Sequence, residues 1–430
     1  MLASAVVLGP ALVAAMILYL LQKHLRLKNT PRPIGTAVEE AWCLAAGRPS
    51  NYQQQMGELH QKNGEVVRLE PGFVSLSDVE DIAQAYRVNV LDEVGHDRID
   101  VLGYQSTWRD QETIDNTLRG LVQTIRRYKT VDITTILGYF VDQLSGQLSN
   151  SAYHDADVTA QSLPGIASSS SVLATLEELL LQGPVSILKR KRLSCHSPPK
   201  DISNHTHYRH SRAGTYENMD SGLGASFESL RRSFVLVIPF LLQHPSVMQK
   251  LRAEVESLPR FGNKSTMPYS RDFASALYLE AVLNETLRLV ILQEYQMRIN
   301  LTTKPLHIFS KHILSGALIV WHPNVVLSEQ FTFGDEPDAF RPERWLDSDR
   351  CRLDLMKRSL LPFAVCRAEC EQVDSAWLLL KKTVVVLLRE FDDLQMANTQ
   401  RLEEILRQMT GSRSLPSILI RVRPRSTIHT

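Results

Sequence analysis

A segment with two cysteines, followed by a long apolar run, constrains most strongly what this chain can fold into. Residues 360–370 read Leu-Leu-Pro-Phe-Ala-Val-Cys-Arg-Ala-Glu-Cys, and residues 377–391 carry mostly leucine and valine. We expect Pro362 and Phe363 to open a short loop that leads into a buried helix at 377–391. The N-terminus of a helix stabilises negative charge, which favours the thiolate of a nearby cysteine over its thiol. The pattern therefore predicts a cysteine sulfur presented by a loop beneath a core helix.

This segment alone leaves two interpretations open. Cys366 and Cys370 can be small hydrophobic residues of the core, which is common for free cysteine. Alternatively, one of them can hold a flat ligand, because a cysteine thiolate is one of the proximal ligands of haem iron. The sequence upstream favours the second interpretation.

Two charged blocks precede the cysteines. Glu285-Thr-Leu-Arg288 lies in a helical run at 278–289, and Asp338–Trp345 contains a Pro-Glu-Arg motif. These blocks, in this order before the cysteine segment, resemble the cytochrome P450 superfamily of haem-thiolate monooxygenases. The residues of these segments are most similar to those of fungal microsomal members of the pisatin-demethylase type. The resemblance implies a mainly α fold with a small β domain, behind an N-terminal transmembrane helix.

The composition is that of an ordinary globular protein. Of the 430 residues, 43% are hydrophobic and 22% are charged, and the net charge is +1. This balance gives no electrostatic case for binding nucleic acid or an acidic substrate. The five cysteines are odd in number and widely spaced, which argues against a disulfide framework and suits a reducing compartment.

The N-terminus predicts a membrane anchor. Residues 2–22 carry no charge, and Lys23, Arg26 and Lys28 follow at once. About twenty apolar residues span a bilayer core, and positive charge after the span favours a cytosolic body. A cleaved signal peptide would have a basic start and a small-residue cleavage site, and neither is clear. We therefore expect an uncleaved, single-pass anchor at 1–28, in the endoplasmic reticulum membrane by resemblance, and one cytochrome P450-like domain at 29–430.

Three local patterns predict the small β domain and its neighbouring helix. Residues 64–76 hold β-branched runs on both sides of a Pro-Gly pair, which predicts a hairpin. A helix with an acidic start is expected at 78–88. Residues 312–326 read as a short β pair that would line the site.

The resemblance weakens at about 90–125 and again at 162–224. The family carries a tryptophan followed four residues later by an arginine that reaches a haem propionate, but here Trp108 is followed by Glu112 at that distance. Residues 130–144 resemble the next family helix. Most of 162–224 has no apolar period, so we expect it to be loop or disordered.

The resemblance places an oxygen-activating helix before His244-Pro245. Counting back from this pair puts Glu228 and Ser229 where the family has an acid followed by an alcohol. A carboxylate and a hydroxyl side by side can relay protons during oxygen activation, so these two are the implied catalytic residues. The alternative is a solvent-facing pair on an amphipathic helix.

Glu285 and Arg288 lie three residues apart and therefore on one helical face. By resemblance they form a buried structural triad with Arg344, which locks the chain before the cysteine segment; a surface i,i+3 pair is the local alternative. The resemblance also implies that Arg298 touches a haem propionate.

Within the cysteine segment, Phe363 and Cys370 stand at the separation that the family requires. The resemblance therefore implies that Cys370 binds the iron of heme b, that Cys366 does not, and that Phe363 contributes to the cofactor site. Glu369 and Glu371 flank the sulfur and would disfavour the thiolate.

The same segment departs from the family pattern. Its first glycine, its arginine and its last glycine are replaced by Cys366, Ala368 and Gln372, and Arg367 is one position off. Glycines allow close backbone approach and turns that other residues disfavour, so these losses bear directly on haem binding.

Three functions are consistent with these observations. The first is a haem-thiolate monooxygenase that inserts one oxygen atom from O2 into a small apolar molecule, in fungal secondary metabolism, with electrons from NADPH through a membrane NADPH-cytochrome reductase. The second is a degenerate relative, or the product of a mis-spliced gene, that keeps the scaffold without haem. The third is a membrane-tethered helical binding protein without redox ancestry.

Overall fold

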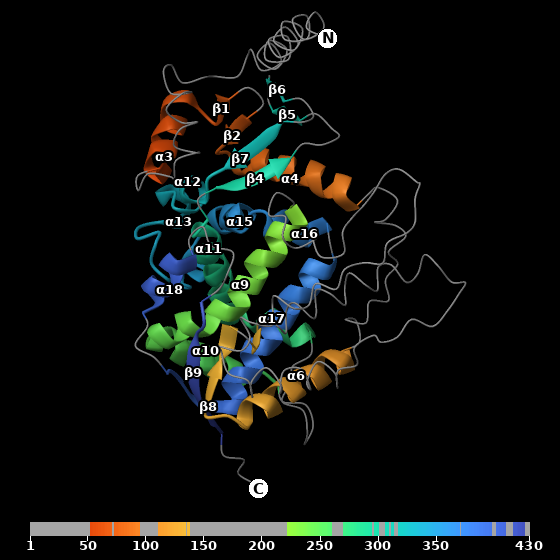
Figure 1. Cartoon of the computed structure of the whole chain (residues 1–430), viewed down its shortest axis with the longest axis vertical. Coiled ribbons are helices and arrows are strands. Elements are labelled where there is room, and N and C mark those ends of the chain that lie inside the picture. The colour runs from red at the N-terminus through yellow and green to blue at the C-terminus, as the bar shows by residue number, and fades with distance from the viewer. Residues whose placement is uncertain are drawn as a thin grey trace, which may run out of the picture.

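The computed structural model describes residues 52–70, 73–94, 111–134, 136–137, 222–259, 270–294, 296–300, 306–308, 311–313, 317–369, 371–397, 401–409 and 416–425. Most of this part of the chain is helical, with strands in three small sheets (Figure 1). The predicted mainly α character with a small β component is confirmed. The predicted anchor at 1–28, Trp108 and nearly all of 162–224 lie outside the described residues.

The elements are named as follows. The longer helices are α3 (Tyr52–Asn63), α4 (Val79–Val94), α6 (Gln111–Arg126), α9 (Gly222–Gln243), α10 (Pro245–Ser257), α11 (Leu277–Leu292), α15 (Arg350–Ser359), α16 (Phe363–Glu369), α17 (Glu371–Glu390) and α18 (Leu402–Met409). The short helices are η1 (Ser270–Ser275), α12 (Pro323–Leu327), α13 (Gln330–Phe333) and α14 (Arg344–Asp347). The strands are β1 (Val66–Glu70), β2 (Phe73–Leu76), β3 (Thr130–Asp132), β4 (Met297–Asn300), β5 (Leu306–Ile308), β6 (Lys311–Ile313), β7 (Leu318–Trp321), β8 (Phe391–Met396) and β9 (Leu419–Pro424).

A four-stranded sheet lies at one end of the molecule, with the strand order β1-β2-β7-β4 (Figure 1). β1 and β2 pair antiparallel, which confirms the predicted hairpin at 64–76. The expected β pair at 312–326 is wrong, because β6 and β7 belong to different sheets. β6 pairs with β5, whereas β7 is held between β2 and β4 through its buried Ile319, Val320 and Trp321.

The helix expected at 78–88 is confirmed as α4, which continues to Val94. Asp78 caps its start, since the Asp78 Oδ1 accepts hydrogen bonds from the backbone N–H groups of Glu80 (2.9 Å) and Asp81 (3.0 Å). Such a cap satisfies donors that the first helical turn leaves unpaired.

A three-stranded antiparallel sheet, ordered β3-β9-β8, lies at the opposite end (Figure 1). The predicted start of the helix at 130–144 is therefore wrong. Thr130–Asp132 form β3 and pair with Leu419–Arg421 of β9. Two β-branched residues, Thr130 and Val131, favour this strand, and the buried Val131 packs into the core. The described helical turns follow only from Ile133.

Helices α9, α11 and α17 form the centre of the core. Most residues of α11 are apolar, and residues 281–292 are all buried, so neighbouring elements cover every side of this stretch. Arg389 on α17 joins this centre to α10, donating to the carbonyl oxygens of Val255 (2.9 Å) and Leu258 (2.8 Å). It thereby satisfies acceptors at the end of α10 that have no helical partner.

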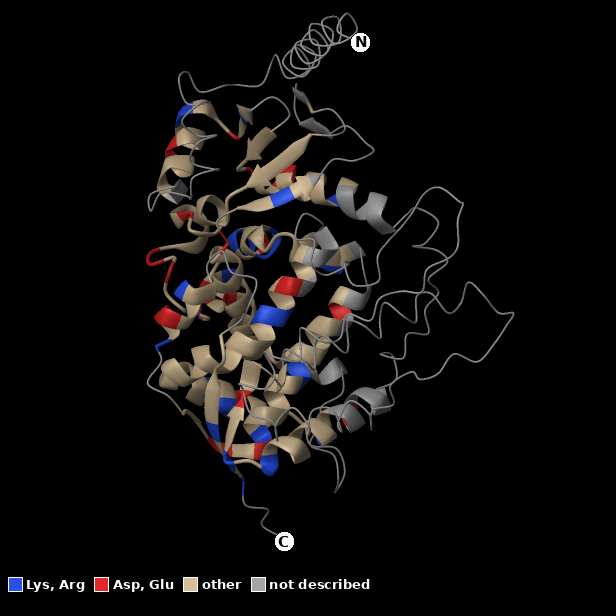
Figure 2. Cartoon of the chain, viewed as in Figure 1, with Lys and Arg blue, Asp and Glu red and all other residues tan. Residues whose placement is uncertain are grey.

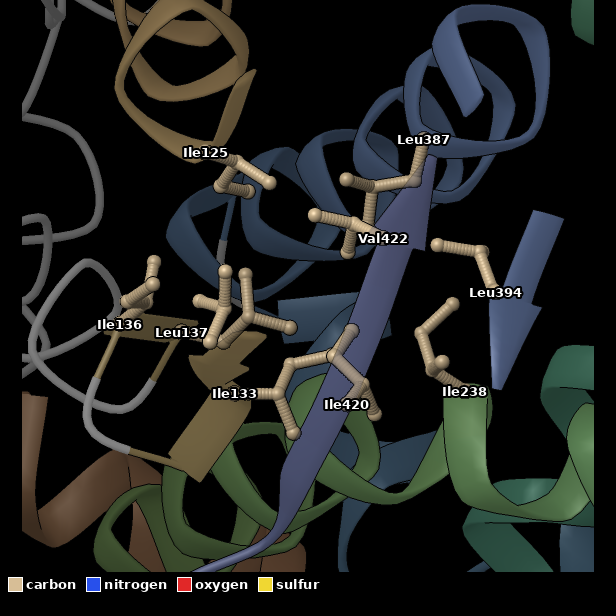
Figure 3. A pocket seen from close by; sticks show the side chains of 10 residues that line it. Ile125, Ile133, Ile136, Leu137, Ile238, Leu387, Leu394, Ile420 and Val422 are labelled. Carbon is tan, nitrogen blue, oxygen red and sulfur yellow. The ribbon is translucent and has the colours of Figure 1, made fainter. Parts of the chain in front are cut away.

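An apolar cavity of about 10 Å³ lies where α6, α9, α17 and the three-stranded sheet meet (Figure 3). Ile125, Ile238 and Leu387 are among the side chains that point into it, and all of its lining residues are aliphatic. A cavity needs about 10–15 Å³ to hold one water molecule, and the water needs polar partners. This gap is therefore a packing defect and not a ligand site.

Among the described helices, none is long and apolar enough to cross a bilayer by itself. Residues Glu228–Gln243 of α9 and the whole of α10 meet the length and composition criteria together, but the chain bends by 112° between them.

Candidate functional site

The structure brings Glu285, Arg288 and Arg344 together in a buried network. Arg288 donates from Nε to Glu285 Oε2 (2.9 Å) and from Nη2 to Oε1 (2.8 Å). Arg344, at the start of α14, donates from Nε to the same Oε1 (3.0 Å). The Glu285 and Arg288 side chains are 0% exposed and Arg344 is 5% exposed, so the surface-pair alternative is wrong.

The network has members that the sequence did not indicate. Trp345 donates from its indole Nε1 to Glu285 Oε2 (2.9 Å), and the backbone N–H of Arg341 donates to Oε1 (3.0 Å). Arg288 also donates to the carbonyl oxygen of Leu327 (3.1 Å). Trp345 directly follows the Pro-Glu-Arg motif, so its position next to Arg344 was the available signal.

These bonds fasten the segment from Leu327 to Trp345 onto α11. A carboxylate that accepts from two guanidinium groups, an indole and an amide is fully solvated by protein, which is what a buried charge requires. The network therefore positions the chain that leads into α15 and α16, and it does so from a face of α11 that water cannot reach.

The carboxylate of Glu228 lies in a second charged cluster, on α9. Arg231 donates to it from Nε (2.8 Å) and Nη2 (2.7 Å), and Arg232 donates from Nε (2.8 Å). Arg232 also donates to Glu294 (2.6 Å), just beyond the end of α11. Acidic and basic segments accordingly adjoin along α9 in Figure 2.

Burial of Glu228 acts to raise its pKa, but the hydrogen bonds and charges of Arg231 and Arg232 outweigh burial, so the pKa lies below its ordinary value. Glu228 is therefore held as an ionised partner of two arginines.

Ser229, the alcohol of the implied pair, has a different environment. Its hydroxyl donates to the carbonyl oxygen of Ala225 (2.8 Å), one turn earlier in α9. Adjacent residues of a helix project about 100° apart, so Glu228 and Ser229 face different surroundings. In the described arrangement the Glu228 carboxylate accepts from the arginines, whereas the Ser229 hydroxyl donates within its own helix.

The predicted loop at 360–370 is wrong. Residues Phe363–Glu369 form helix α16. The predicted buried helix at 377–391 is confirmed as part of α17, which begins at Glu371 and ends at Glu390. The amide of Ala364 donates to the carbonyl of Leu360 (2.8 Å), and that of Cys366 donates to the carbonyl of Pro362 (3.1 Å). Alanine, arginine and glutamate favour a helix, and residues other than glycine stand where a turn would need glycine.

α16 is held in place by its neighbours on α17 and α11. The rings of Phe363 and Trp377 lie with centroids 4.9 Å apart, and Arg367 lies over both rings. Arg367 also donates from Nε to Asp374 (2.7 Å) and pairs with Glu280 (3.5 Å). We call Phe363, Arg367, Asp374, Trp377 and Glu280 the α16 clamp.

The remaining site residues are dispersed. Cys366 is a buried residue of α16, and Cys370 lies between α16 and α17, outside the described residues. Arg298 is exposed on β4, where its backbone pairs with Val320 of β7. The described part of the chain contains no group of three or more metal-ligating side chains.

A haem does not fit the described arrangement. If Cys370 holds the iron, a haem would need space beside the cysteine segment, next to α9. α16 packs directly against α9 and α4, and several Cα atoms of α16 lie within 8 Å of Cα atoms of α9. Arg367, the cation nearest in sequence to the expected propionate partner, is turned toward Asp374 and Glu280.

Comparison with known proteins bears on the origin of this arrangement. A family model described as Cytochrome P450 matches residues 211–416. A cytochrome P450 monooxygenase of Aspergillus flavus is 30% identical over 164 residues, which cover 38% of this chain and 32% of the relative. A cytochrome P450 monooxygenase of Emericella nidulans is 30% identical over 191 residues, covering 42% of this chain and 34% of the relative.

Cytochrome P450 3A19 of Capra hircus aegagrus is 29% identical over 199 residues, covering 46% of this chain and 87% of that sequence. The match spans about a third of the length of the first curated relatives. The matched region contains α9, the Glu285 network, α16 and α17. Residues 211–416 of the chain are therefore similar to the cytochrome P450 superfamily.

Proposed function

We propose that the protein is a haem-thiolate monooxygenase that inserts one oxygen atom from O2 into a small apolar organic substrate. The observation that carries this proposal is the buried network of Glu285, Arg288 and Arg344, placed upstream of Cys370 inside the family match. A bound haem would supply oxygen activation, and Cys370 is the residue that would hold its iron. Electrons would come from NADPH through a membrane reductase.

A second candidate function is favoured by α16. α16 is a helix where a loop was predicted, and it packs against α9. The second candidate is therefore a protein that keeps the cytochrome P450 scaffold but does not bind haem. The replacements Cys366, Ala368 and Gln372 agree with this candidate, because each removes a residue type that the family uses around its haem. A degenerate gene or a mis-spliced transcript would produce such a chain.

Haem uptake separates the two candidates. Full-length protein titrated with hemin should take up about one haem per chain if the first candidate is right, measured by Soret absorbance per mole of protein. Replacing Cys366→Gly, Ala368→Arg and Gln372→Gly together should strengthen uptake, because glycines return to the turn and a cation returns to the propionate. No uptake by the wild type, with uptake by the triple variant, would establish the second candidate.

The proposed location is the endoplasmic reticulum membrane, with residues 1–28 as anchor and the body in the cytosol. The support is the uncharged run at 2–22 and the basic residues after it. Deleting residues 1–28 should move the protein from the membrane pellet to the soluble fraction, because about twenty apolar residues supply the membrane affinity. If the shortened protein still sediments with membranes after a high-salt wash, a second membrane contact exists and the anchor proposal is insufficient.

A further inference from the structure

α16 is a helix whose stability comes from its neighbours. It has seven residues, and isolated helices shorter than about 12–15 residues are marginal in water. Its buried Phe363 and Cys366 face the core, while Ala368 is exposed. The α16 clamp adds a ring contact and the ion pairs of Arg367. The helix is therefore conditional on the packing around it.

The space that α16 fills is also the space that a haem would need. Carbon atoms pack at about 3.5–4.0 Å, so a flat ring between two helices separates the atoms on its two faces by about 7–8 Å. The Cα atoms behind those side chains lie farther apart still. Where Cα atoms of α16 and α9 lie within 8 Å of each other, there is no room for a ring between the two helices.

Arg367 has a second candidate partner, a haem propionate. Arg367 is one position from the place where a propionate-neutralising arginine is expected, and its carboxylate partners are partly solvent-exposed: Asp374 by 58% and Glu280 by 27%. Exposed ion pairs are weak, so a haem propionate can compete with them for the guanidinium.

We propose that helical α16 and a haem are mutually exclusive occupants of the space beside α9, so that haem entry requires residues 363–369 to unwind and Arg367 to leave Asp374. The inference rests on the proposed function for the identity of the ligand. The helical form is then the haem-free state of the protein, and the α16 clamp sets how readily haem enters.

Hydrogen exchange of the full-length protein tests this directly. Haem-free protein should protect the amides of 366–369, and hemin addition should speed their exchange by about tenfold or more, in proportion to the Soret band, as expected when a helix opens locally. The peptide covering α11 should keep its protection, because the Glu285 network does not change.

Two variants loosen α16 and leave Cys370 unchanged. Asp374→Asn removes one ion pair of Arg367 and should lower the hemin concentration at half-saturation roughly two- to fivefold. Ala368→Gly removes only an exposed methyl group and helix propensity, and should lower it by up to about fivefold.

The chain offers a matched control in Asp392→Asn. Arg425 donates from Nε to Asp392 at 2.7 Å and pairs with Glu256, just as Arg367 donates from Nε to Asp374 at 2.7 Å and pairs with Glu280. Asp392 lies in β8, in the sheet at the far end of the molecule, so its variant should leave hemin affinity unchanged.

The outcomes separate this inference from the proposed function. If the wild type takes up haem while 363–369 stay protected, the inference is overturned and the function stands. If only the loosened variants take up haem, with faster exchange, the inference holds and the function fails for this chain. If neither the wild type nor either variant takes up haem, α16 is not what excludes it, and the inference is overturned.

Discussion

Replacing Arg288 with alanine should prevent the accumulation of folded protein. The substitution leaves the Glu285 carboxyl group buried with fewer donors, and it removes the bond from Arg288 to the Leu327 carbonyl. Breaking a fully buried ion pair by removing one partner costs about 3–5 kcal/mol. Because whole domains are stable by only about 5–15 kcal/mol, this loss is a large share of the total.

Soluble yield and the midpoint of thermal unfolding measure the effect. Arg358→Ala is the control: Arg358 is 60% exposed and pairs with Glu80 at 3.7 Å, so its removal should change stability by no more than about 0.5 kcal/mol. An Arg288→Ala variant with the yield and melting temperature of the control would mean that the network does not support the fold.

Replacing Cys370 with serine should abolish thiolate ligation of haem. A serine hydroxyl stays protonated near neutral pH and cannot donate to iron as a thiolate does. The expected result is loss of the red-shifted Soret band of the reduced, carbonylated protein. Cys366→Ser is the matched control, because it changes the other thiol of the same segment, four residues earlier, and should leave that band in place.

If both cysteine variants lost the band equally, the effect would come from disturbance of the segment and Cys370 would not be identified as the ligand. If Cys366→Ser alone lost it, the assignment of the two thiols would be reversed.

The Glu285 network was accessible from sequence because its members lie in short motifs of fixed spacing. Glu285 and Arg288 are one turn apart on a mostly apolar helix, so each is the nearest oppositely charged partner of the other. Arg344 was predicted as their partner only from the family resemblance. It lies 56 positions after Arg288 and 59 after Glu285, so no local pattern links it to them. Trp345 and the Arg341 amide were missed because their roles depend on how the loop folds back.

The conformation of α16 was not accessible in the same way. The resemblance carried the expectation of a loop, but the residues that make a loop favourable, the glycines, are absent here. Local propensity and packing against α9 and α17 then decide for a helix. The surroundings of Glu228, the acid of the predicted proton-relay pair, could not be predicted either. Two arginines that lie one turn away pair with its carboxylate.

The absorption spectrum of the wild-type, full-length protein is the most direct test of haem-thiolate function. The protein is reconstituted with hemin, reduced and exposed to carbon monoxide, with Cys370→Ser treated in parallel. The proposal predicts about one haem per chain and the red-shifted Soret band of a thiolate-ligated haem in the wild type alone. A wild type that takes up no haem, or that shows the same unshifted band as Cys370→Ser, would contradict it.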